Sequence, residues 1–242
     1  MTVRKMRIRL RYHPINRMLR QMGMVEEASF VVRGNRMSIQ GYNPSKTVFS
    51  RISFSLDEIR LDSDGLEQPT TSGIVFFRSV LENARPWDVE FDISQNNIEM
   101  ITREFRLNVP AAQNIISCPL EYPEEHFKAS TRGEQFKKWI NECHNDGKIM
   151  KLQGNPEKLE IYSKNKLIAT YDDLIESKGI HESSYSTNLF KEFTKYIHKK
   201  DIIHLKFSDG YPMHLVIIPD ETFYIGLDAM IEYLISPTLM RY

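Results

Sequence analysis

Lysine side chains recur at helical spacing in the last quarter of the chain, where they could bind a phosphate-rich ligand. Lys191, Lys195 and Lys199 stand four residues apart, with Asn188 beside them. On an α-helix this spacing places three ammonium groups on one stripe, where neighbours repel by roughly a few tenths of a kcal/mol each. A bound external anion would relieve this repulsion. The alternative is a solvated lysine face with no ligand.

Four segments predict amphipathic helices with a basic or amide outer face, over about 14–23, 71–84, 131–147 and 187–199. Pro14 opens the first and Gly23 closes it, and Thr131 to Glu134 has the composition of a capping box for the third. Phosphate contacts from such faces give salt-dependent binding that is independent of base sequence. The polar residues outside the apolar stripes include Arg17, Arg20, Arg78, Lys138, Asn141, Asn188, Lys191 and Lys195.

The charge of the chain is unevenly distributed. The 242 residues have a formal net charge of +0, yet residues 1–60 carry twelve basic side chains against four acidic ones. A neutral protein with this split can present one face to a polyanion while its other faces stay neutral or acidic. Overall neutrality therefore does not exclude nucleic acid as a partner.

Short alternating segments and turn residues predict antiparallel strands around these helices, and hence an α+β fold. The element order of the first half returns after Pro123, which favours a ring-forming building block over an enzyme. We expect a first domain over 1–109, a connector over 110–123 that is too rich in proline for a central strand, and a second domain over 124–242. The expected strands are 3–11, 28–32, 36–40, 47–54, 89–93, 101–109, 125–128, 148–153, 159–163, 167–172, 202–207, 213–218 and 230–235.

Other kinds of chemistry find little support in the sequence. There is no apolar run long enough to span a membrane and no signal peptide, so we expect an intracellular protein. His198 and His204 lack a carboxylate at ligand spacing, and no phosphate loop or nucleophile elbow is present, so no metal, cofactor or catalytic residue is expected. Cys143 precedes His144 but falls on the buried stripe of its helix, which indicates a core thiol.

Several short motifs, taken in order, resemble the sliding clamps of archaeal and eukaryotic replication, the proliferating cell nuclear antigen (PCNA) family. The first-domain strands and turn are similar over 27–32, 37–41 and 43–49, and the end of the connector is similar over 117–123. The closing half is similar from Tyr185 to Pro212, and the final strand and tail over 233–237. The resemblance covers nearly the whole chain through many short motifs.

This resemblance implies a two-domain clamp fold, three copies of which close head to tail into a ring with helices lining the hole and sheets outside. The contact would be antiparallel pairing between 101–109 of one subunit and about 166–172 of the next, although both could instead be covered edges of a monomer. The residues expected to face duplex DNA are Arg17, Arg20, Arg78, Lys138, Asn141, Asn188, Lys191 and Lys195.

The resemblance also implies docking of DNA polymerases, ligases, nucleases and the clamp loader through short hydrophobic peptides. The connector is slightly longer than usual and the last residues are not the family's acidic ending, so the preferred peptides stay open. The resemblance also implies that the protein is located in the cytoplasm of an archaeon or in the nucleus of a eukaryote. The matching positions are Tyr42, Lys46, Thr47, Phe49, Val109, Pro110, Pro212, Leu234, Ser236 and Pro237, of which the apolar ones could also be core.

Two other functions remain open at the level of sequence. The chain could be one subunit of a heterotrimeric or checkpoint-type clamp, which shares the fold and differs in which edges pair. It could also be a monomeric DNA-binding processivity or transcription factor that uses its basic helices on one open surface. The first predicts assembly with paralogous subunits, whereas the second predicts no ring and electrostatic retention on linear DNA.

Overall fold

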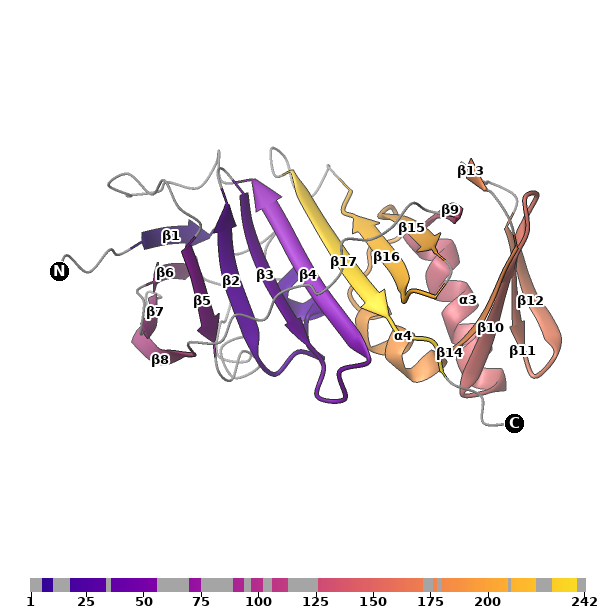
Figure 1. The fold of residues 1–242 in the computed structure, drawn as a ribbon, viewed down its shortest axis with the longest axis horizontal. Helices are drawn as coiled ribbons and strands as arrows, with labels where there is room; N and C mark the ends of the chain where they lie inside the picture. The colour runs from indigo at the N-terminus through magenta and orange to yellow at the C-terminus, as the bar shows by residue number, and fades with distance from the viewer. Residues whose placement is uncertain are drawn as a thin grey trace. The chain divides into compact units, whose positions relative to one another are not determined.

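The structure is a computed structural model, and the chain divides into two compact units (Figure 1). The first unit comprises residues 1–119 and 221–231, and the second comprises 120–220 and 232–242. The residues that the structure describes are 6–10, 18–33, 36–55, 70–74, 89–93, 97–101, 106–112, 126–171, 176–177, 180–208, 210–220 and 228–238.

The first unit is built from antiparallel strands, with neighbours in the order β1-β6-β7-β8-β5-β2-β3-β4. A helical stretch over residues 18–21 precedes β2 in the chain, and Met18, Leu19 and the following Met22 are buried as their spacing predicts. The strands are β1 (Met6–Leu10), β2 (Ala28–Arg33), β3 (Arg36–Tyr42), β4 (Val48–Ser55), β5 (Thr70–Ile74), β6 (Val89–Ile93), β7 (Asn97–Ile101) and β8 (Arg106–Ala112).

The expected second helix is wrong at its start. Residues 70–74 form strand β5, which pairs with β2 so that Thr71 lies opposite Val31 and Thr70 opposite Val32. Threonine can cap a helix, which is why Thr71 suggested a helix start. Its β-branched side chain also favours strands, and this second preference fits the pairing of β5 with β2. The rest of that expected helix, including Arg78, lies outside the described residues.

The expected strand over 101–109 is also wrong, because β7 ends at Ile101 and β8 begins at Arg106. The two strands form an antiparallel pair in which Ile101 lies opposite Arg106. Strand β8 continues to Ala112, three residues into the expected connector. Pro110 is tolerated because it forms the last pair with β7, opposite Asn97, before β8 pairs with β5 at Ala111.

The described residues of the second unit form two sheets and two helices. One sheet has the order β17-β16-β15-β9-β13 and the other β12-β11-β10-β14, and residues 229–231 of β17 belong to the first unit. The elements are β9 (Phe127–Arg132), α3 (Gly133–Asp146), β10 (Ile149–Gly154), β11 (Leu159–Ser163), β12 (Lys166–Tyr171), β13 (Glu176–Ser177), β14 (His181–Ser186), α4 (Thr187–Thr194), β15 (Ile202–Phe207), β16 (Met213–Ile218) and β17 (Ala229–Ile235).

Helix α3 contributes one apolar face to the core of this unit, where it contacts α4 and strands of both sheets (Figure 1). Trp139 packs edge-on against Tyr171 of β12, with ring centroids 5.0 Å apart. From α4, Phe193 stacks on Tyr233 of β17 at 4.4 Å. Each such ring buries a large apolar area, so these contacts hold the helices against the sheets. The buried side chains of α3 are Phe136, Trp139, Ile140 and Cys143.

The start of α3 differs from the expected capping box. Thr131 is still part of β9, Arg132 is the N-cap, and no side chain caps the helix. The first amides are satisfied by distant backbone instead: Gly133 N–H donates to the carbonyl of Asp201 at 2.8 Å, and Glu134 N–H donates to that of Lys199 at 3.1 Å. Backbone carbonyls replace the capping side chain at this helix end.

Helix α4 is shorter than expected and ends at Thr194 instead of about residue 199. Ile197 nevertheless remains buried, because the turns after the helix carry it into the core. Among the described residues, no helix is long and apolar enough to cross a membrane.

Candidate nucleic-acid interface and peptide site

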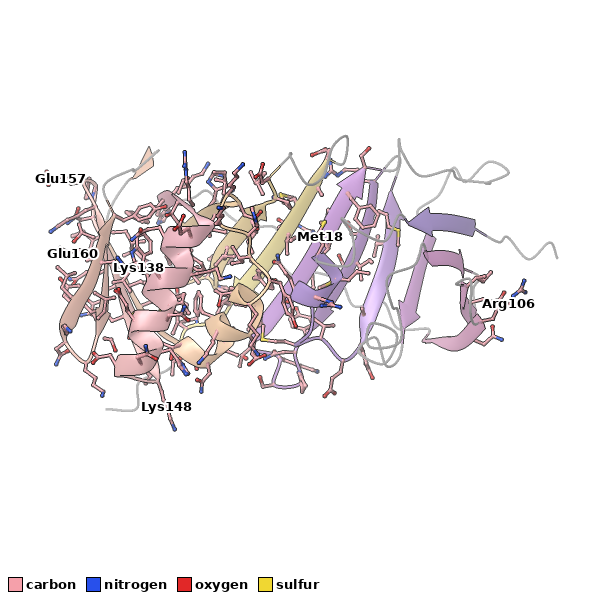
Figure 2. All side chains as sticks on the ribbon, turned by 180° about the vertical axis from the view of Figure 1, so that it is seen from behind. Met18, Arg106, Lys138, Lys148, Glu157 and Glu160 are labelled. Atoms are coloured by element: carbon pink, nitrogen blue, oxygen red, sulfur yellow. The ribbon has the colours of Figure 1, made fainter. Side chains whose placement is uncertain are left out.

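The outward face of α3 carries two of the residues expected to contact DNA. Lys138, which is labelled in Figure 2, and Asn141 are both exposed, whereas Phe136, Trp139, Ile140 and Cys143 on the opposite side of the helix are buried. The neighbouring Lys137 is only half-exposed, and its Nζ donates to the carbonyl of Ile197 at 3.2 Å. Helical periodicity therefore placed Lys138 and Asn141 on the solvent side as predicted.

The lysine stripe expected on α4 is not continuous. Asn188 is exposed and Lys191 half-exposed on the helix, but Lys195 is its C-cap and Lys199 lies beyond it in a turn. Lys195 Nζ also pairs with Glu192 Oε2 at 2.9 Å. The repulsion that argued for an external anion is therefore largely removed by the end of the helix and by this carboxylate.

In the first unit the structure describes one of the three arginines expected to face DNA. Arg20 is exposed at the end of the helical stretch over 18–21. Arg17 and Arg78 lie outside the described residues. Their role, like that of the other DNA-facing residues, stays a prediction.

The loop between β3 and β4 carries part of the expected peptide site and is organised by Asn43. The buried Asn43 side chain accepts the amides of Thr47 and Val48 through Oδ1, both at 2.9 Å. Its Nδ2 donates to Ser45 Oγ at 2.9 Å and to Thr47 Oγ1 at 3.0 Å. Lys46 has a positive φ of 55° at the tip of this loop. One amide side chain thus fixes the shape of the whole turn.

On either side of this loop, Tyr42 and Phe49 form an edge-on ring pair with centroids 5.1 Å apart. They are direct partners across β3 and β4, so the ring contact is a cross-strand pair. Phe49 is buried and Tyr42 half-exposed, so Tyr42 and the polar Lys46 and Thr47 offer the accessible surface. Val109 and Pro110, also in this unit, belong to β8.

The remaining residues expected to bind peptides belong to the second unit. Leu234 is only 8% exposed in β17, which makes it mainly a core residue. Pro212 and Ser236 are half-exposed, and Pro237 is exposed. Just beyond, the amide of Thr238 donates to the carbonyl of Ser184 in β14 at 2.7 Å, so the segment after β17 is held against that strand.

Strands β12 and β8 each have a stretch of backbone that no described strand covers on one side, and such a stretch can pair with another chain. Strand β12 is the last strand of its sheet and pairs only with β11 among the described strands, and its Leu167 is 47% exposed. In β8, residues 106–110 pair with β7 and residues 111–112 also pair with β5. The part of β8 near the exposed Arg106 thus keeps one side without a described partner strand.

Sequence reasoning missed Asp201, which is a structural centre of the second unit. Its fully buried carboxylate accepts the amide of His198 at 2.6 Å and the amide of Asp220 at 3.1 Å. An acidic residue directly before the apolar run at Ile202 is a common turn-capping signal, and it could have indicated this role. The backbone of the same residue accepts the first amide of α3.

The expectation of a core thiol is confirmed, because Cys143 is fully buried. Burial, assisted by Glu142 and Asp146, raises the pKa of Cys143 to about 11, which keeps it a protonated thiol and a poor nucleophile.

The ring of His204 has a hydroxyl beside it, because His204 Nδ1 lies 2.6 Å from Ser130 Oγ. Within the described part of the chain, no group of three or more histidine, cysteine or acidic residues could hold a metal ion.

Known structures share this architecture over nearly the whole chain. A structure of the C-terminal region of FEN-1 bound to A. fulgidus PCNA has a TM-score of 0.76 at 15% identity, covering 98% of this chain and 100% of the other. The chain has the fold of the PCNA sliding clamps. It is an α+β clamp fold with antiparallel sheets, as the sequence predicts.

Two further clamps agree with this result. The PCNA2–PCNA3 complex of Sulfolobus tokodaii gives a TM-score of 0.71 at 18% identity over 96% of this chain and 98% of the other. PCNA of Thermococcus kodakaraensis gives 0.73 at 15% identity over 96% and 100%. No protein-family model and no curated sequence matches the chain. The clamp fold is thus shared at low sequence identity.

Proposed function

We propose that this chain is a subunit of a DNA sliding clamp, a ring that encircles duplex DNA and tethers replication and repair enzymes without chemistry of its own. The observation that supports this most is the clamp fold itself, which extends over 96–98% of the chain in the three comparisons.

The ring would close by pairing the open edge of β8 in one subunit with the open edge of β12 in the next. Antiparallel strand pairing satisfies the exposed amides and carbonyls of both edges, and it would cover the apolar side chain of Leu167. Because each subunit offers one edge of each kind, the contact is head to tail, and such contacts form a ring when the rotation between subunits closes. We propose that it closes with three copies.

DNA would pass through the ring as a loosely held polyanion. Exposed Arg20, Lys138 and Lys195 would attract phosphates, and exposed Asn141 and Asn188 would bind them as neutral donors. Contacts to phosphate carry no sequence information, so such a surface permits movement along the duplex.

Enzymes would dock through short hydrophobic peptides on the turn that Asn43 organises. One of the similar structures contains the C-terminal region of FEN-1 bound to a clamp. Tyr42, Lys46 and Thr47 offer an aromatic ring, a cation and a hydroxyl on a rigid turn, which suits a short peptide of this kind. Polymerases, ligases and the loader would compete for the same positions.

Topology provides the test of this function. The chain would be incubated with an ATP-dependent clamp loader and nicked circular DNA, and the retained protein measured before and after a restriction enzyme linearises the circle. A clamp stays on the circle at salt concentrations that remove electrostatic binders, and it leaves once ends are available. Equal retention on circular and linear DNA would contradict encirclement and would support a monomeric electrostatic binder.

A heterotrimeric ring is the second candidate, because one of the similar structures is a complex of two different PCNA subunits from Sulfolobus tokodaii. In that case the edges of β8 and β12 would pair with those of paralogous chains. Mixing the chain with its paralogues and measuring the mass of the complex separates this candidate from the homotrimer.

A further inference from the structure

The exposed face of α3 is not a basic surface. Glu134, Lys138 and Glu142 stand four residues apart and are all exposed, so they form one stripe along the helix. The single lysine is therefore flanked one turn away on each side by a carboxylate. The rest of this face is made of the neutral amides Gln135, Asn141 and Asn145.

The same balance extends over both helices of the second unit. Together α3 and α4 contain the lysines Lys137, Lys138 and Lys191, and the acids Glu134, Glu142, Asp146 and Glu192. Two of the nearby ammonium groups are also engaged: Lys137 donates to the carbonyl of Ile197, and Lys195 after α4 pairs with Glu192. Helices α3 and α4 of the second unit thus carry no excess of positive charge.

These carboxylates are close enough to weaken a phosphate contact. Residues one helical turn apart have Cβ atoms about 5–6 Å apart. Two unit charges about 6 Å apart in water interact by roughly 0.7 kcal/mol. That distance is within the Debye length of about 8 Å at physiological salt, so screening does not remove the effect. A phosphate that approaches Lys138 therefore meets Glu134 and Glu142 as well.

We propose that Glu134 and Glu142 are built-in attenuators of DNA contact on α3, an inference that rests on the proposed clamp function. They offset the attraction of Lys138 for phosphate, so that the helix lines the path of DNA without holding it. The consequence is a shallow electrostatic surface, which favours movement of the ring along the duplex over binding at one place.

The experiment compares the intact chain with a Glu134→Gln/Glu142→Gln variant for equilibrium binding to a short duplex, by fluorescence anisotropy over a series of NaCl concentrations. The variant is expected to bind about three- to tenfold more tightly at low salt, from the removal of two repulsive interactions. The difference should shrink as salt increases. Its salt dependence should steepen by up to about one unit of slope, as Lys138 gains a phosphate.

The matched control is Glu157→Gln, which removes one carboxylate at the exposed β10–β11 turn and away from the helices (Figure 2). It should leave duplex binding unchanged. A second test is Lys138→Gln, which should weaken binding more in the Glu134→Gln/Glu142→Gln background than in the intact chain. Thermal melting verifies that every variant is folded.

The outcomes separate this inference from the proposed function. If the double variant binds like the intact chain, or if Glu157→Gln has the same effect, the attenuator role is overturned while retention on circular DNA can still support the clamp. If neither the intact chain nor the variant binds duplex at low salt, and the protein is not retained on circular DNA, both the clamp function and this inference are contradicted.

Discussion

Gly133 and His198 lie so close together that a Cβ atom on Gly133 would overlap the carbonyl oxygen of His198. The same Cβ would also press on the Ile197 side chain. Because the amide of Gly133 donates to Asp201 at 2.8 Å, the first residue of α3 is fixed against the turn that leads into β15. This contact joins the start of α3 to the segment between α4 and β15.

Replacing Gly133 by alanine should therefore destabilise the second unit. The added methyl group meets backbone atoms, which cannot rotate away, so the helix or the turn must shift. We expect a loss of about 3 kcal/mol in the free energy of unfolding, measured by denaturant titration. The control Gln135→Ala changes an exposed residue of the same helix and should be near neutral. Equal stability of Gly133→Ala and the intact chain would contradict this packing.

The carboxylate of Asp201 should be needed for the same junction. In Asp201→Asn one oxygen becomes an NH₂ group that faces an amide donor of either His198 or Asp220. Because this side chain is fully buried, we expect a loss of about 2 kcal/mol, read from thermal or chemical unfolding. Asp146→Asn, in the last turn of α3, is the control and should be neutral or slightly stabilising.

Cys143 should make stability fall in alkaline solution. Its ordinary pKa of 9.0 is raised to about 11 by burial, so between these values the unfolded chain loses a proton that the folded chain keeps. The stabilisation is complete below pH 9.0 and is lost as pH rises towards 11. The intact chain should lose up to about 2 kcal/mol more than Cys143→Ser over this window. If the free energies of unfolding of the intact chain and of Cys143→Ser change in parallel with pH, this role of the Cys143 thiol is contradicted.

Asn43 should control peptide binding through the shape of its turn. Asn43→Ala removes the four hydrogen bonds that the Asn43 side chain makes within the turn, and we expect about tenfold weaker binding of a synthetic peptide from the C-terminal region of FEN-1. Calorimetry would measure this. The control is Asn155→Ala. It removes the hydrogen bonds of a similar turn, in which Asn155 Oδ1 accepts the amides of Glu157 and Lys158, and it should leave the affinity for the peptide unchanged.

Strands with clear alternation could be predicted closely from the sequence. The bounds of β11 and β15 are those expected, because buried Leu159 and Ile161, or Ile203 and Leu205, alternate with more exposed residues. Strand β16 also has the expected bounds, although its middle residues are all buried. Gly147 likewise ends α3 as predicted. In such segments burial on one face determines the local pattern, and the pattern is visible in a single sequence.

Elements that depend on distant partners could not be predicted in this way. The capping box at Thr131 had the right residue types, but the amides of α3 are capped by carbonyls more than sixty residues away, at Lys199 and Asp201. Thr70 and Thr71 belong to a strand because β2 is there to pair with them. Ile197 fits a helical stripe yet reaches the core from a turn. No local signal distinguishes these cases.

The exposure of the expected DNA-facing residues on α3 could be predicted from the sequence, whereas the charge around them was not, and their contact with DNA stays a prediction. Periodicity correctly placed Lys138 and Asn141 on the open side of α3. Counting only basic residues overlooked Glu134 and Glu142 on the same stripe, and the lysine series after Lys191 assumed a helix that ends at Thr194. The direct partners of the turn residue Asn43 also required the structure.

The central claim is that copies of this chain close into a ring through β8 and β12, and its most direct test is the solution mass by light scattering at several concentrations and salts. The account predicts a stable species at three times 28.4 kDa. Leu167→Glu on β12 should shift it towards monomer, whereas Ile180→Glu, at a residue that is 77% exposed, should not. A chain that stays at 28.4 kDa under every condition would contradict closure of the ring by this chain alone.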